Sequence, residues 1–207
     1  LFAINIASWE TIEQLVKEGQ NTYRMLRYAP FPVVSVAHNM ALGGGCEIHL
    51  HTDYVVAHAE TYTGLVETGV GVIPGWGGCT QLLGRAYHHP KQRKGPMPAL
   101  AQVFEQVAMA KISKSAAEAR DLMYLLDGKH SITFNIDRVL QDAKAKALEL
   151  SKNYTAPEPY TYRLPGPTGK AAINLVVSAM KAVGKVTPHD EVVIDTLADV
   201  LSGGKTN

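Results

Sequence analysis

Two glutamates beside glycine-rich segments, Glu47 and Glu67, are the side chains of this sequence best placed for acid–base chemistry. Glu47 ends the run Ala-Leu-Gly-Gly-Gly-Cys-Glu at residues 41–47, and Glu67 follows 20 residues later (67 − 47). Three glycines after a predicted strand let the backbone turn sharply and leave N–H groups bare at the start of a helix. Such a turn is a ready site for an anion or oxyanion. The helix dipole there favours ionised Glu47, as a general base needs.

Each of these features also has an ordinary structural explanation. Three adjacent glycines occur in turns that bind no ligand, and a carboxylate at a helix start can simply accept hydrogen bonds from unpaired backbone amides. Glu67, in a predicted loop, could be a solvated surface residue. The glycine run is not a nucleotide-binding P-loop, because no Gly-Lys-Ser/Thr follows it.

Short strands and helices in alternation must position these residues. The apolar repeat predicts a helix over residues 8–29 with Ser8 as its N-cap, and a β-rich run predicts a buried strand at 33–37. A helix carrying residues 46–52 and another buried strand at 54–57 follow. This order predicts an α/β fold in which helices pack on a sheet.

Two regions are expected along the chain. The segment 64–78 holds six glycines and a proline, so it is predicted to be a loop with tight bends before a helix at about 79–87. A polar, proline-interrupted stretch then separates a core region, residues 1–98, from a mainly helical region, residues 99–207. We expect the helical region to serve oligomerisation.

Composition excludes several classes of protein. With Lys+Arg 20 against Asp+Glu 19, the formal charge is +1, which gives no electrostatic signal for nucleic acid or an anionic membrane. No apolar run approaches the roughly 20 residues of a membrane span. Cys46 and Cys79 are too few for a disulfide framework and are predicted to be free thiols in a reducing compartment. We expect a cytoplasmic protein, or one of the mitochondrial matrix if its source is eukaryotic.

The stretch 31–86 resembles the core signature of the crotonase (enoyl-CoA hydratase/isomerase) superfamily. It holds the glycine-rich turn that ends at Glu47, then Asp53, the step from Gly64 to Glu67, and the sequence Ile-Pro-Gly-Trp-Gly-Gly at 73–78. The spacing of 20 between the glutamates is that of the catalytic pair in hydratases of this family. The resemblance implies an α/β fold with a crotonase (ClpP-like) ββα spiral core, here N-terminally incomplete, followed by a C-terminal helical region.

The resemblance also implies roles for individual residues. Glu47 and Glu67 would position and polarise one water that adds across the C2=C3 bond of a 2-enoyl-CoA, and the N–H of Gly44 would bind the enolate oxygen. The substrate-binding positions it implies are Gly43, Gly45, Pro74, Gly75 and Trp76. No redox or metal cofactor is implied, because coenzyme A is part of the substrate. The family forms homo-oligomers, so a trimer or hexamer is expected.

Some positions depart from the family pattern. Asn39 replaces a glycine, although asparagine tolerates a left-handed backbone, Val66 replaces a frequent proline, and Cys79 looks like an additional residue. In the family an oxyanion donor and several strands precede the helix predicted at 8–29, so we expect an N-terminally truncated module. The end of the sequence, from Thr187, resembles the end of proteins that fuse 3-hydroxyacyl-CoA dehydrogenase to a hydratase. NAD would enter only through such a domain upstream.

Two alternatives stay open. An enoyl-CoA isomerase would move a proton through Glu67 alone, and a non-catalytic domain would serve assembly through its helices. No metal site is expected, because His49 and His51 are two residues apart on a predicted helix and face different directions. A ClpP-type protease would need a serine at the glycine-rich helix start, where none stands. Trp76 could equally be a packed aromatic residue.

Overall fold

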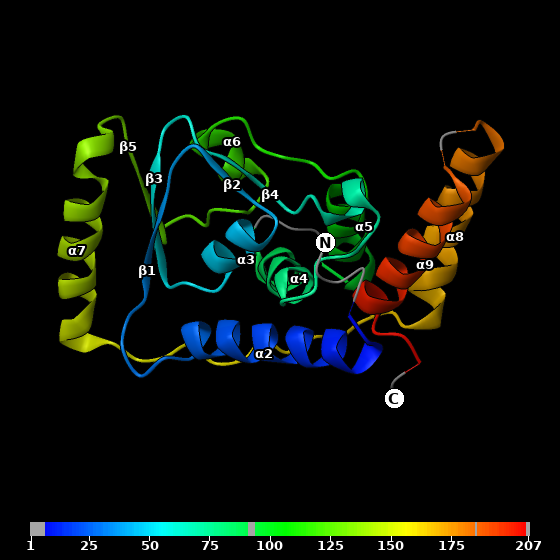
Figure 1. Ribbon diagram of the computed structural model, residues 1–207, viewed down its shortest axis with the longest axis horizontal. Helices are drawn as coiled ribbons and strands as arrows, with labels where there is room; N and C mark the ends of the chain where they lie inside the picture. Colours follow the sequence, from blue (N-terminus) through cyan, green and yellow to red (C-terminus); the bar gives the residue numbers. More distant parts are fainter. Residues whose placement is uncertain (1–6, 91–93, 185, 206–207) are drawn as a thin grey trace.

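The computed structural model describes three stretches of the chain, residues 7–90, 94–184 and 186–205. At the centre lies a three-stranded parallel sheet (Figure 1). It consists of β1 (Val34–Ala37), β3 (Tyr54–His58) and β5 (His130–Thr133), in the order β1-β3-β5. Valines line up across its middle, with Val36 opposite Val56, as expected for strands buried on both faces.

A second parallel pair positions the glutamates. It joins β2 (Met40–Leu42) to β4 (Tyr62–Gly64), two strands of only three residues. The helix α3 (Gly44–Leu50) follows β2, and the 3₁₀ helix η1 (Glu67–Val70) follows β4 after two residues. Because the pairing is parallel, the elements that carry Glu47 and Glu67 begin at the same end of the pair. Asn39, just before β2, has φ +52°, which confirms its left-handed backbone.

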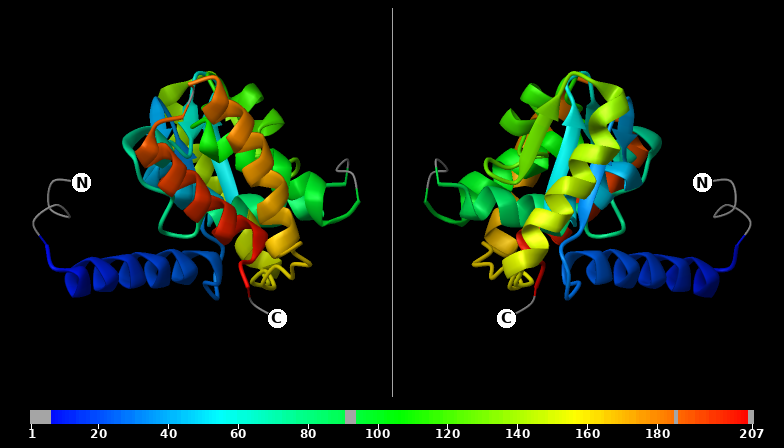
Figure 2. Two further views of the ribbon diagram at one scale, coloured as in Figure 1. Left: turned by 90° about the vertical axis from the view of Figure 1, so that its right-hand side faces the viewer. Right: turned by 90° about the vertical axis from the view of Figure 1, so that its left-hand side faces the viewer.

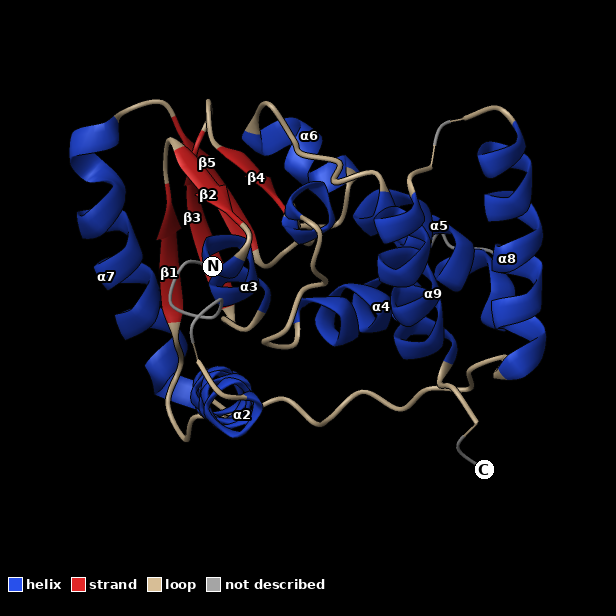
Figure 3. Cartoon of the chain, turned by 45° about the vertical axis from the view of Figure 1, so that its right-hand side comes forward, coloured by secondary structure: helices blue, strands red, loops and turns tan. Residues whose placement is uncertain are grey.

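Helices cover both faces of the central sheet (Figure 3). On one face α7 (Val139–Leu150) packs against β1 and β3, and on the other lie α3 and α4 (Gly78–His88). Next to α4 is α5 (Pro96–Ala108), and the main core fills the space between these helices. Its fully buried side chains include Leu50, Leu82, Leu100, Val103 and Tyr124.

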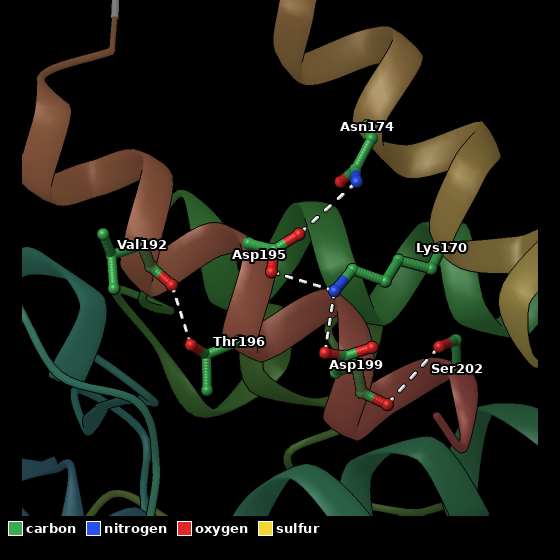
Figure 4. Close-up of polar contacts among 7 residues, drawn as sticks. All are labelled: Lys170, Asn174, Val192, Asp195, Thr196, Asp199 and Ser202. Carbon is green, nitrogen blue, oxygen red and sulfur yellow. Dashed lines mark hydrogen bonds and ion pairs between the residues drawn. The ribbon is translucent and has the colours of Figure 1, made fainter. Parts of the chain in front are cut away.

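The C-terminal helices α8 (Pro167–Ala182) and α9 (Pro188–Ser202) form an antiparallel pair on the side of α5 away from the sheet (Figure 1). Lys170 Nζ bridges Asp195 and Asp199 at 2.9 and 2.7 Å (Figure 4). The remaining elements are α6 (Ala116–Asp121), η2 (Ile136–Arg138) and η3 (Ser151–Asn153). Within the described part of the chain, no helix is both long enough and apolar enough to cross a bilayer.

The long helix α2 (Trp9–Arg27) touches the rest of the molecule mainly through its second half. Ser8 caps it, as predicted, by accepting a hydrogen bond from the Thr11 N–H. Its buried residues are Tyr23 and Arg27, and its N-terminal end projects beyond the rest of the molecule (Figure 2). Any influence of α2 on the rest of the fold must therefore pass through its last three turns.

The α/β fold and the helices predicted at 8–29 and 79–87 are confirmed. The short strands β2 and β4 were not predicted. Nor was β5, which lies in the region expected to be mainly helical and yet completes the central sheet. The division between residues 98 and 99 falls inside α5 and remains a prediction about domain organisation.

Candidate active site

The turn between β2 and α3 brings the two glutamate-bearing segments together. Gly43 has φ +55° and ψ −123°, and its N–H donates to the Gly64 carbonyl at 2.8 Å. A Cβ at Gly43 would lie 3.3 Å from Oε1 of Glu67. Glycine is required here for two reasons, because the backbone is left-handed and because it passes directly against a carboxylate.

Gly44 is the first residue of α3, so its N–H has no acceptor within the helix. A Cβ at Gly44 would meet the Trp76 ring at 3.5 Å and the Tyr23 hydroxyl at 3.6 Å, which are ordinary contacts. At Gly45 a Cβ would meet only Ala41, at 4.0 Å. Packing therefore does not demand glycine at either position, and at Gly44 the missing side chain keeps the N–H accessible.

Glu47 is 2% exposed and lies in the first turn of α3. Its Oε1 accepts hydrogen bonds from the backbone N–H groups of Trp76 at 3.0 Å and Gly78 at 2.8 Å. Burial raises the pKa of Glu47 to about 7, the Gly78 hydrogen bond opposes the rise, and the nearby Glu67 carboxylate adds to it. At neutral pH Glu47 therefore populates both protonation states, as a general acid–base group must.

Glu67 begins η1 and faces the same turn. Its Oε2 is buried and has no hydrogen-bond partner among the described residues. Burial also raises the pKa of this carboxyl group. Buried polar atoms are normally hydrogen-bonded, so this oxygen is available to a further polar group beside Glu47.

The loop before α4 closes the site from the other side. Pro74 is buried, and the Gly75 carbonyl accepts a hydrogen bond from Gln20 Nε2 at 2.9 Å. No atom lies within 4 Å of the position that a Cβ at Gly75 would take. The Trp76 ring packs edge-on against Tyr23, with ring centroids 5.4 Å apart. The loop thus contributes one backbone donor to Glu47 and one aromatic wall beside Gly44.

The structure gathers Glu47, Glu67, Gly43, Gly44 and Trp76 around one point, while Gly45 and Gly75 make no close contact there. One expectation, that Glu47 is held in its ionised form, is wrong. The sequence suggested that the dipole of its own helix would keep it ionised, yet burial outweighs that effect and the donors come from the loop and from α4.

Sequence reasoning missed the contribution of α2 and of the first residue of α4. Gly19 and Tyr23 contact the Trp76 ring, and Gln20 holds the loop. The spacing of Gly19 and Tyr23 by four residues already put them on one predicted helix face. Nothing in the sequence showed that this face meets the active-site loop rather than the core.

The histidines of α3 and its C-cap are structural. His49 Nδ1 pairs with the Ser35 hydroxyl at 2.9 Å, and His51 Nδ1 with the Glu47 carbonyl at 2.7 Å. Burial lowers the pKa of both rings to about 4, so both are neutral at pH 7. They point to different partners, as their spacing predicted.

Comparison with known proteins places this geometry in a family. Residues 7–94 match the family described as enoyl-CoA hydratase/isomerase. That segment contains the turn, both glutamates and the loop of the candidate site. The candidate site therefore lies within the part of the chain that is similar to this family.

Relatives extend the similarity over nearly the whole chain. A Bacillus subtilis protein named "Probable 3-hydroxyacyl-CoA dehydrogenase" is 38% identical over 195 residues, which is 94% of this chain and 24% of that protein. A Rickettsia prowazekii protein named "Putative fatty acid oxidation complex trifunctional enzyme" is 45% identical over 83 residues, 40% of this chain and 12% of that protein. The chain thus spans about a quarter or less of the length of these relatives.

Solved structures of enoyl-CoA hydratases share the fold. The enzyme from Bacillus anthracis aligns with a TM-score of 0.56 at 22% identity, over 95% of this chain and 64% of that one. The enzyme from Thermoplasma volcanium aligns with a TM-score of 0.55 at 15% identity, over 96% and 65%. The chain therefore shares the crotonase fold of these solved structures.

Proposed function

We propose that the chain carries the hydratase chemistry of fatty-acid β-oxidation, the addition of water to the C2=C3 bond of a 2-enoyl-CoA. The observation that supports this most directly is the meeting of a buried and a half-buried carboxyl group at a glycine turn. Glu47 and Glu67 both have raised pKa values, and the Gly44 N–H at the start of α3 has no acceptor within the helix. Two acids of this kind beside a backbone donor suit an addition that passes through an enolate.

The two glutamates divide the proton transfers. Ionised Glu47, with Oε1 held by two N–H groups, keeps Oε2 for the attacking water and takes a proton from it as the oxygen bonds to C3. Glu67, whose pKa burial raises, delivers a proton to C2 as the double bond opens. The product gains one water, and a proton passes from Glu47 back to Glu67 to restore the starting state.

The thioester oxygen gains negative charge while C3 is attacked. The Gly44 N–H, without an acceptor in α3, can donate to this oxygen. Loss of one such donor typically costs about 3 kcal/mol of transition-state stabilisation, a rate effect of about a hundredfold. Coenzyme A is then the part of the substrate that the protein binds. The proposed substrate-binding positions are Gly43, Gly45, Pro74, Gly75 and Trp76.

Wider features of the protein belong to the same proposal. The dehydrogenase and trifunctional names of its relatives favour a multifunctional parent, in which NAD would serve a separate dehydrogenase domain. Two apolar side chains exposed on α8, Leu175 and Val176, favour a homo-oligomer, a trimer or hexamer as the resemblance implies. We place the protein in the cytoplasm, or in the mitochondrial matrix of a eukaryote.

The test compares Glu47→Gln and Glu67→Gln in the full-length protein with a short 2-enoyl-CoA, by following loss of enone absorbance. Both variants should lose hydration by at least a hundredfold. Glu60→Gln, at an exposed turn, controls for the chemical change. Loss with Glu67→Gln alone would instead identify an isomerase, and an unaltered protein that assembles but binds no acyl-CoA would support an assembly domain.

A further inference from the structure

Three residues of α2 contact both halves of the proposed active site. Gln20 Nε2 donates to the Gly75 carbonyl of the loop at 2.9 Å, and the Tyr23 hydroxyl donates to the Gly44 carbonyl of the oxyanion turn at 3.1 Å. Gly19, one helical turn before Tyr23, faces the loop next to Gln20. Since α2 is otherwise largely exposed, these are among its few ties to the rest of the molecule.

The absence of a side chain at Gly19 creates a notch that the Trp76 indole fills. A Cβ on Gly19 would lie 2.2 Å from Nε1 of Trp76 and 2.5 Å from its Cδ1 and Cε2. The Tyr23 ring packs edge-on against the same indole. Glycine in a helix interior is normally unfavourable relative to alanine, so this glycine is retained at a cost that the close approach explains.

The indole and the catalytic carboxylate are linked by a single residue. The backbone N–H of Trp76 donates to Glu47 Oε1 at 3.0 Å, and Gly78, two residues later, donates to the same oxygen. A displaced Trp76 indole would also shift the backbone N–H of Trp76 relative to Glu47. Hydrogen bonds weaken steeply as their angles depart from linearity, so this bond would weaken. The position of α2 therefore determines how well Glu47 is held.

We propose that Trp76 is a positioning residue for Glu47, and that α2 sets its place through the notch at Gly19 and the ties from Gln20 and Tyr23. The catalytic part of this inference rests on the proposed function, whereas the link from α2 to Glu47 does not. Gly19, which lies on another helix and far from Glu47 in the sequence, would thus control the position of this acid–base group.

The first test is Gly19→Ala in a Trp9→Phe background, which leaves Trp76 as the only tryptophan within residues 1–207. Helix propensity alone predicts a higher melting temperature for this change, whereas an occupied notch predicts a lower one. The Trp76 emission should move to longer wavelength as the indole leaves its contact. Asn21→Ala, exposed on the same helix, is the matched control: helix propensity should raise its melting temperature slightly, and its emission should not change.

The second test follows Glu47 itself through the pH dependence of Trp76 emission. Loss of the Trp76 hydrogen bond removes a group that lowers the Glu47 pKa, so the titration midpoint, near 7 in the parent, should move to higher pH. Gly19→Ala and the milder Gln20→Ala should both show this shift, and Glu47→Gln should abolish the titration. In an active hydratase, kcat should fall about tenfold, and the acidic limb of its pH profile should shift to higher pH likewise.

Other titratable groups lie near Trp76 and Glu47, and their effect on the pH dependence of Trp76 emission must be distinguished from that of Glu47. Burial raises the pKa of Tyr23 on α2 and of Cys79 on α4, and it lowers that of His51 to about 4. Glu67 on η1 is the group whose titration overlaps, and Glu67→Gln removes it.

The two proposals fail in different ways. An unchanged emission and midpoint in both Gly19→Ala and Gln20→Ala would overturn the positioning role, even if the protein hydrates enoyl-CoA. If the unaltered protein does not hydrate, the proposed function fails, and the emission titration still decides whether α2 positions Glu47.

Discussion

Replacement of Glu47 by glutamine should make the folded protein more stable at alkaline pH while it removes hydration. The amide oxygen of glutamine can still accept the N–H groups of Trp76 and Gly78, so the local hydrogen bonds are kept. The amide cannot ionise, however, and so escapes the cost of a buried charge beside Glu67. The active site would thus be one place where function is kept at the expense of stability.

The size of the effect follows from the pKa of Glu47. A rise from the ordinary 4.5 to about 7 corresponds to about 3 kcal/mol, at about 1.4 kcal/mol for each tenfold change in the ionisation constant. Below pH 4.5 the carboxyl group is protonated in the folded and the unfolded chain, and the wild type loses no stability. Between 4.5 and about 7 only the folded chain keeps the proton, so stability falls as pH rises, and above that range the full cost is present.

Urea unfolding of both proteins near pH 5 and near pH 8.5 measures this difference. The variant should gain roughly 3 kcal/mol relative to the wild type at the higher pH and little at the lower. Glu60→Gln provides the control for an exposed carboxylate. A stability difference that does not change with pH would refute the reasoning that burial raises the Glu47 pKa.

Three further predictions concern the supporting structure. Gly43→Ala should lower stability by about 1–3 kcal/mol in urea unfolding, because φ is +55° and Glu67 is adjacent, and a neutral result would contradict the required turn. Cys46 and Cys79 should resist thiol reagents in the folded protein and react in urea, since burial raises both pKa values, that of Cys46 to about 12; fast native labelling would contradict their burial. Arg85→Met should cost at least about 3 kcal/mol, because Arg85 donates to four backbone carbonyls, and a loss below about 1 kcal/mol would show that those carbonyls find other donors.

Local signals predicted the long helices well and the short strands poorly. The cap at Thr187 with Pro188 and the left-handed Gly203 mark the two ends of α9, and each is visible in the sequence. In contrast, β2 and β4 have three residues each, too few for an alternating pattern. The strand β5 forms by pairing with β3, some 75 residues earlier in the sequence, which no local pattern can show.

The candidate site shows the same limit. Spacing and glycine content were enough to select Glu47, Glu67 and Gly44, because those features are local. The sign of the Glu47 pKa change could not be predicted, since it depends on burial created by α4 and the loop at Trp76. Likewise, the notch at Gly19 becomes meaningful only when α2 is laid against a loop 57 residues away (76 − 19).

The most direct test of the central claim is the reaction of a 2-enoyl-CoA in ¹⁸O-labelled water with the full-length protein and its Glu47→Gln and Glu67→Gln variants. The account predicts that the unaltered protein places the label in a 3-hydroxyacyl product, and that each variant nearly abolishes it. Unlabelled product with a shifted double bond, formed equally well by Glu47→Gln, would contradict it.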